Sequence, residues 1–233
     1  MRFHLRVSLI VGVALGISFH APSVRGDEPA RALRFELSKD DAQKAKKLAQ
    51  QLAALSPRVN PEEAKLLAAC AFATVGKLRR EYRMFGTPIF NNFLVYHGIR
   101  KRGYCYQWSE DLLVALDKLK LRTLELRWGE AHPGTWRENN CIVVTAKGQP
   151  FSQGIMLECW RHLGHLSFGP VAAAATDNFD PYTENAAYAR FVRQKAAAAQ
   201  PSPRGHHVAF STGMMEKRKK AARSAGDAGS HYE

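Results

Sequence analysis

The chain has 233 residues, an ordinary apolar content of 45% and no excess of glycine or proline, which suits one globular domain with flexible ends. Its formal net charge is +13, but the basic residues stand in separate runs without an RNA-binding or helix-turn-helix signature, so a specific nucleic-acid partner is not expected. Affinity for an anionic cell-envelope polymer or a membrane surface is the milder expectation from this charge.

The first 26 residues are typical of an export signal. Arg2 and Arg6 supply positive charge, residues 7–19 form an apolar stretch, and Val24-Arg25-Gly26 offers small residues at the cleavage positions. The apolar run of 13 residues is short for a bilayer span, although an uncleaved anchor is the alternative, and no later stretch is apolar enough to cross a membrane. We therefore expect a secreted or periplasmic bacterial protein whose mature chain carries a net charge of +10 after three arginines are removed from +13.

Helices are predicted in the first half of the mature chain. Each of the first two begins with a polar N-cap residue, Ser38 or Asn60, and carries an acidic residue in its first turn. The predicted segments are a helix after Ser38, a helix from Asn60-Pro61 to about Arg83, a shorter helical or irregular segment at 89–99, and a helix from about 104 to 120.

The hydrophobic period then changes from that of a helix to that of a strand. Strands are predicted at 121–128, 141–146 and 154–160, followed by a final helix at 183–199. Helices followed by an antiparallel meander predict an α+β protein, with N-terminal helices packed on a small antiparallel sheet. The predicted organisation is a signal peptide (1–26), an N-terminal helical part (27–97), a core with a C-terminal helix (98–199) and a disordered basic tail (200–233).

Cys105 is the first candidate for chemistry. It opens the helix in "RKRGYCYQWSEDLLVAL" (100–116), where the helix dipole and the charges of Arg100, Lys101 and Arg102 would lower its thiol pKa. A lowered pKa would favour a nucleophilic thiolate. The alternative is a buried thiol that happens to begin a helix.

The sequence around Cys105 resembles the core of transglutaminase-like cysteine hydrolases, which belong to the papain-like group. The run "RGYCYQWSEDLLVALDKLKLRTLEL" is similar to that family's G-x-C helix start and its turn into the first strand, and "RENNCIVVTAKGQPFSQGIMLECWRHLGHLSFGP" resembles an exported bacterial branch of the group. The resemblance covers roughly residues 98–170. It implies a papain-like core in which Cys105 attacks an amide or ester carbonyl of a peptide, protein or cell-envelope substrate, with no cofactor.

Two positions depart from the family pattern. Asn139 stands where the family has its histidine, and Glu158 stands where it has an aspartate. Glutamate can orient an imidazole, but asparagine cannot act as a general base. His132 is the nearest substitute base, and further candidates with a lower claim are His162 and His165.

The departures leave three functions open. The first is an exported cysteine hydrolase or acyl transferase that uses Cys105, His132 and Glu158. The second is a catalytically degenerate relative that serves as a binding or structural module, which Asn139 favours. The third is a basic binder of anionic cell-envelope polymer that uses residues 77–83 and the tail.

The cysteines allow a competing account of the strands. A hairpin centred on Pro150 would set Cys141 opposite Cys159, and export permits the disulfide that we predict there. A direct pairing of Asn139 with Glu158 would need a different centre. The alternative use of these cysteines is a zinc site completed by His162 and His165, and Cys70 is expected to be a buried apolar residue.

Aromatic residues flank Cys105. Trp108 and Tyr104 are the candidates for a substrate-binding cleft, because Trp108 lies one helical turn after the cysteine and Tyr104 directly before it.

Overall fold

The structure of the protein is a computed structural model that describes residues 35–135, 137–174 and 181–199. The described residues belong to one compact unit, and the predicted signal peptide and basic tail lie outside them. The helices are α1 (Lys39–Ala53), α2 (Pro61–Tyr82), α3 (Pro88–Tyr96), α4 (Cys105–Asp117), the 3-10 turn η1 (Phe151–Gln153), α5 (Val171–Ala174) and α6 (Ala186–Ala198). The strands are β1 (Leu124–Ala131), β2 (Asn139–Ala146), β3 (Ile155–Glu158), β4 (Ser167–Pro170) and β5 (Thr183–Glu184).

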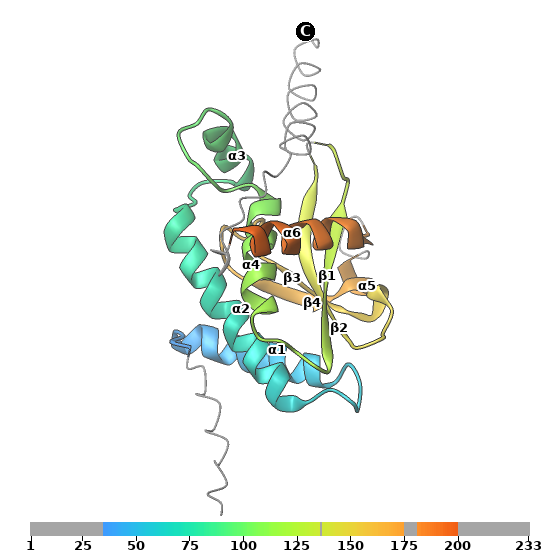
Figure 1. Cartoon of the computed structure of the whole chain (residues 1–233). Helices are drawn as coiled ribbons and strands as arrows, with labels where there is room; N and C mark the ends of the chain where they lie inside the picture. Colours follow the sequence, from blue (N-terminus) through green and yellow to red (C-terminus); the bar gives the residue numbers. More distant parts are fainter. Residues whose placement is uncertain (1–34, 136, 175–180, 200–233) are drawn as a thin grey trace, which may run out of the picture. The chain divides into compact units, whose positions relative to one another are not determined.

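The strands form one antiparallel sheet in the order β4-β3-β2-β1-β5 (Figure 1). The central strand β2 is buried along its whole length. Helices on a small antiparallel sheet confirm the predicted α+β class. The two short strands β4 and β5 were not predicted, because runs of four and two residues carry no periodicity to read.

The predicted helix starts are confirmed by their capping contacts. The Ser38 side chain accepts a hydrogen bond from the backbone N–H of Asp41, and the Asn60 side chain accepts one from Glu62. The carboxylate of Glu63 makes a contact that the sequence does not indicate. It accepts hydrogen bonds from the backbone N–H groups of Arg122 and Thr123, both at 2.8 Å. These contacts occupy the chain just before β1, so the strand begins at Leu124 rather than at 121.

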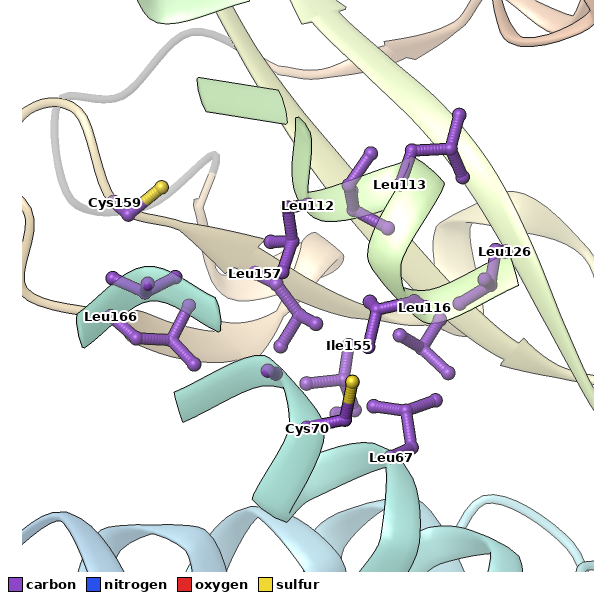
Figure 2. Close-up of a cluster of buried hydrophobic side chains, with 14 of the residues drawn as sticks. Leu67, Cys70, Leu112, Leu113, Leu116, Leu126, Ile155, Leu157, Cys159 and Leu166 are labelled. Atoms are coloured by element: carbon purple, nitrogen blue, oxygen red, sulfur yellow. The ribbon is translucent and has the colours of Figure 1, made fainter. Parts of the chain in front are cut away.

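The main core lies between α2, α4 and one face of the sheet. Figure 2 shows Leu112 and Leu116 of α4 gathered in one cluster with Leu67 of α2 and Leu157 of β3. Cys70 of α2 is 5% exposed and packs in the same cluster, as predicted for a buried apolar residue. Because each fully buried aliphatic side chain contributes about 1.5–3 kcal/mol, this cluster holds α4 firmly on the sheet.

The opposite face of the sheet carries a smaller cluster. It contains Cys141 and Val143 of β2, together with Tyr182. Ile142 and Val144 of the same strand belong to the main core instead. Successive side chains of β2 therefore point to opposite faces, and this alternation decides which residues can meet Cys105.

In the part of the chain that the structure describes, no helix combines the length and the apolar character that a membrane span requires.

Candidate functional site

Cys105 is the first residue of α4, as predicted, and only 6% of it is exposed. The helix start is fixed by Gln107, whose side-chain oxygen accepts the backbone N–H groups of Gly103 at 2.7 Å and Tyr104 at 3.1 Å. Gly103 has a φ of 153°, and a Cβ there would lie 3.1 Å from a methyl group of Val95. A glycine at this position therefore lets the chain pass close to α3 before the helix begins.

The thiol of Cys105 meets the start of β2. Its Sγ donates to the backbone oxygen of Glu138 at 3.3 Å and accepts a hydrogen bond from Nδ2 of Asn140, also at 3.3 Å. Both groups come from a segment more than thirty residues further along the chain. The sulfur acts as donor and acceptor at once, which is the pattern of a neutral thiol.

Asn140 is the central residue of this site, and it is 1% exposed. Its Oδ1 accepts from the indole Nε1 of Trp128 at 2.9 Å, while Nδ2 also donates to Oε1 of Glu138 at 2.9 Å. An indole N–H can only donate, so Oδ1 has to face Trp128 and Nδ2 has to face Cys105. The backbone oxygen of Asn140 accepts from Ser109, one turn along α4, at 2.9 Å.

Burial raises the pKa of Cys105 to about 12. The hydrogen bond from Asn140 lowers this pKa, whereas the negative charges of Glu138 and Glu158 raise it further. The prediction of a lowered thiol pKa is therefore wrong. The helix dipole is present, but desolvation of the charged form outweighs it.

The basic residues before Cys105 serve other partners. Arg102 donates to the hydroxyl of Tyr82 at 2.9 Å and to Oδ1 of Asp111 at 2.8 Å. Arg100 donates to the backbone oxygen of Tyr82 and to Oδ1 of Asn91, each at 2.9 Å. These arginines join α2, α3 and α4, so the cationic field predicted at the thiol is not what they provide.

Asn139 lies on the other face of the sheet from Cys105. Its Nδ2 donates to the hydroxyl of Tyr182, which belongs to the smaller cluster. Its Oδ1 is buried without a hydrogen bond from the described residues. The family resemblance assigns the histidine position to Asn139, but Asn140 is the residue that contacts the sulfur.

Glu158 also belongs to the face of the smaller cluster. The register pairs Ile142 with Leu157, which places Glu158 opposite Cys141. Glu158 is 3% exposed and its Oε1 accepts from the backbone N–H of Arg161 at 2.9 Å. Burial raises the pKa of this carboxyl group, and the structure does not bring it into hydrogen bond with Cys105.

The candidate histidines do not meet the thiol either. His132 begins the loop between β1 and β2 with a φ of 47°, and its backbone oxygen accepts from the N–H and the hydroxyl of Thr135. His162 Nε2 lies 3.8 Å from Oε2 of Glu158, on a half-exposed side chain. Among the described residues, no histidine forms a hydrogen bond with Cys105.

The predicted disulfide is contradicted by the structure, in which Cys141 and Cys159 are free thiols. Cys141 packs in the smaller cluster and Cys159 in the main core, so their side chains point to opposite faces of the sheet. Within the described ranges, no group of His, Cys, Asp and Glu side chains is arranged to hold a metal ion, so the zinc alternative gains no support.

The two aromatic candidates differ in exposure. Trp108 is fully buried, with its ring 4.6 Å from that of Tyr82, so the prediction that it lines a cleft is wrong. Tyr104 is half-buried and stacks on Tyr106, with 5.7 Å between the ring centroids. Tyr104 is thus the one of the two that a molecule approaching the start of α4 would meet.

Comparison of the chain with protein-family models, with curated protein sequences and with solved structures finds no match. The geometry around Cys105 and the surface of the described residues are therefore what indicates a function.

Proposed function

We propose that this chain is an exported, catalytically degenerate member of the transglutaminase-like group, and that it serves as a binding or structural module. The observation that carries the proposal is the Cys105–Asn140 contact. A cysteine hydrolase needs a group beside the sulfur that takes and returns a proton near neutral pH. The amide of Asn140 has no such titration.

The fixed orientation of Asn140 strengthens this argument. Trp128 and Glu138 hold the amide from two sides, so it cannot turn away to admit a histidine from elsewhere. The thiol proton of Cys105 is directed to a backbone carbonyl, where no transfer can follow. Cys105 and Asn140 thus form a satisfied pair inside the core, and such pairs stabilise a fold.

The proposal is tested by hydrolysis of an activated ester over a series of pH values, with Cys105→Ala as the blank. We expect the parent chain to turn over the ester no faster than this blank. A parent rate above the blank, lost on the Cys105→Ala change, would establish the hydrolase function instead and overturn the proposal.

A matched pair of variants tests which position faces the sulfur. Asn140→His would place an imidazole beside Cys105, whereas Asn139→His would place one beside Tyr182 on the other face. A positioned general base typically contributes about a hundredfold or more. If either variant gains ester turnover, we therefore expect it to be Asn140→His and not Asn139→His. Circular dichroism shows whether both variants are folded. A gain confined to Asn139→His would contradict the assignment of Asn140.

A further inference from the structure

The large apolar side chains that are exposed in the described part of the chain all lie in one segment. Ile99 and Ile89 are 67% and 61% exposed, and the others also belong to α3 or to the turns on either side of it. In Figure 1, α3 stands away from the sheet, beyond the end of α2. We call this set the α3 platform; its members are Phe85, Ile89, Phe90, Phe93, Tyr96 and Ile99.

Hydrogen bonds of one buried side chain fix the backbone of the platform. Asn91 is fully buried, and its Nδ2 donates to the backbone oxygens of Phe85 and Thr87, each at 2.6 Å. Its Oδ1 accepts from the backbone N–H of Phe85 and from the guanidinium group of Arg100. A buried amide that uses all of its hydrogen-bonding capacity fixes the chain around it. The apolar side chains therefore face outward from an ordered scaffold.

Basic residues predominate in the sequence of the platform and its flanks, although one of them, Arg102, is paired with Asp111. Between residues 82 and 109 the sequence contains Arg83, Arg100, Lys101 and Arg102 and no Asp or Glu. Arg83 and Lys101 are both exposed, and they flank the platform in the sequence. Exposed aromatic and aliphatic side chains next to cationic side chains are the combination that binds the interface of an anionic bilayer.

We propose that the α3 platform docks on an anionic lipid bilayer surface. A second copy of the chain fits less well, because a two-fold contact through the platform would set the cations of both copies against each other. A protein groove also fits less well. The apolar side chains extend past both ends of a nine-residue helix to Phe85 and Ile99, so they do not form the single stripe that fills a groove.

This inference goes beyond the proposed function and does not depend on the chemistry of Cys105. None of the platform residues contributes a hydrogen bond to that thiol or to Asn140. Vesicle binding and ester hydrolysis can therefore succeed or fail separately.

The test is co-sedimentation of the protein with vesicles of phosphatidylglycerol and phosphatidylcholine, and with vesicles of phosphatidylcholine alone. The protein is used as it is recovered after export, with its N-terminus established by mass, and every variant carries that same N-terminus. We expect binding to the anionic vesicles. The double variant Phe93→Ser, Ile99→Ser should lower the partition coefficient at least about tenfold, because the full burial of one such side chain already contributes on the order of tenfold.

Two double variants that remove the same charge separate docking from general attraction. Arg83→Gln, Lys101→Gln removes two exposed charges that flank the platform in the sequence, and Lys46→Gln, Lys47→Gln removes two from the exposed face of α1. We expect only the first pair to weaken binding several-fold. Equal losses from both pairs, unchanged binding of Phe93→Ser, Ile99→Ser, or equal binding to neutral vesicles would each overturn the proposal. So would concentration-dependent dimerisation that the platform variant abolishes, because the occupant would then be a second copy.

Discussion

The rate at which Cys105 is alkylated directly tests the effect of burial on its thiol pKa. Thiolate is the form that iodoacetamide alkylates, and raising the thiol pKa from 9.0 to about 12 lowers the thiolate fraction about a thousandfold at any pH below 9. Limited access to a residue that is 6% exposed slows the reaction further. We therefore expect native Cys105 to be alkylated at least about a thousandfold more slowly than the same residue in denaturant.

The assay is pulsed alkylation of the native and the denatured chain at several pH values between about 6.5 and 9, with the peptide containing Cys105 quantified by mass spectrometry. The native rate should keep rising about tenfold per pH unit to the top of the range, because the thiol remains far below its pKa throughout. A native rate that levels off below pH 8, or that equals the denatured rate, would refute the argument from burial. The sequence alone predicts that opposite result, so the measurement separates the two descriptions directly.

Two further predictions concern stability. Asn140→Leu should lower the free energy of unfolding in urea by about 2–3 kcal/mol, because it leaves the buried indole N–H of Trp128 without a partner. Asn139→Leu should cost less, because it removes the hydrogen bond from Nδ2 to the Tyr182 hydroxyl but also removes a buried Oδ1 that has no hydrogen bond. The reverse order of the two losses would contradict the network. Glu158→Gln should stabilise the protein more at pH 7 than at pH 5. Because the pKa of Glu158 is higher in the folded than in the unfolded state, the parent chain loses stability as the pH rises from the unfolded-state pKa through the folded-state pKa. Glutamine does not ionise, so it removes that loss, and its side-chain oxygen can still accept the hydrogen bond from the backbone N–H of Arg161. Urea titrations at the two pH values check this, and a gain that is the same at both would count against a buried, titrating carboxyl group.

The starts of α1 and α2 could be predicted from sequence because capping is local, whereas α6 begins at Ala186 and not at 183, where the chain forms β5. The side chain of Ser38 or Asn60 bonds a backbone group only two or three residues away, so the signal and its effect lie in the same short window. Change of period located β2 and β3 in the same way. These features need no knowledge of the rest of the fold.

The register of the β2–β3 hairpin could not be predicted in this way. Ile142 pairs with Leu157, so the hairpin is centred between Gln149 and Pro150 rather than on Pro150. The connection contains the 3-10 turn η1 instead of a tight two-residue turn, and its length is not set by a simple rule. A small shift moves each side chain of one strand to the other face relative to its partner, which is enough to separate Cys141 from Cys159.

The environment of Cys105 was beyond sequence reasoning for a related reason. The charges next to it in the chain are visible, but Tyr82 and Asp111, which engage Arg102, lie at other positions. The groups that do touch the sulfur come from Glu138 and Asn140, on a different element. Neighbours in sequence suggested a thiol with a lowered pKa, whereas its neighbours in space bury it and raise that pKa.

The carboxylate of Glu63 has a consequence for the order in which the chain folds. It joins the first turn of α2 to backbone groups 59 and 60 residues further along, so the contact requires a long loop to close. Packing of α1 on α2 and pairing of β1 with β2 involve much shorter separations along the chain. We expect these local pieces to form early, and the Glu63 contact to close late, when it fixes where the helical half of the chain ends and the sheet begins.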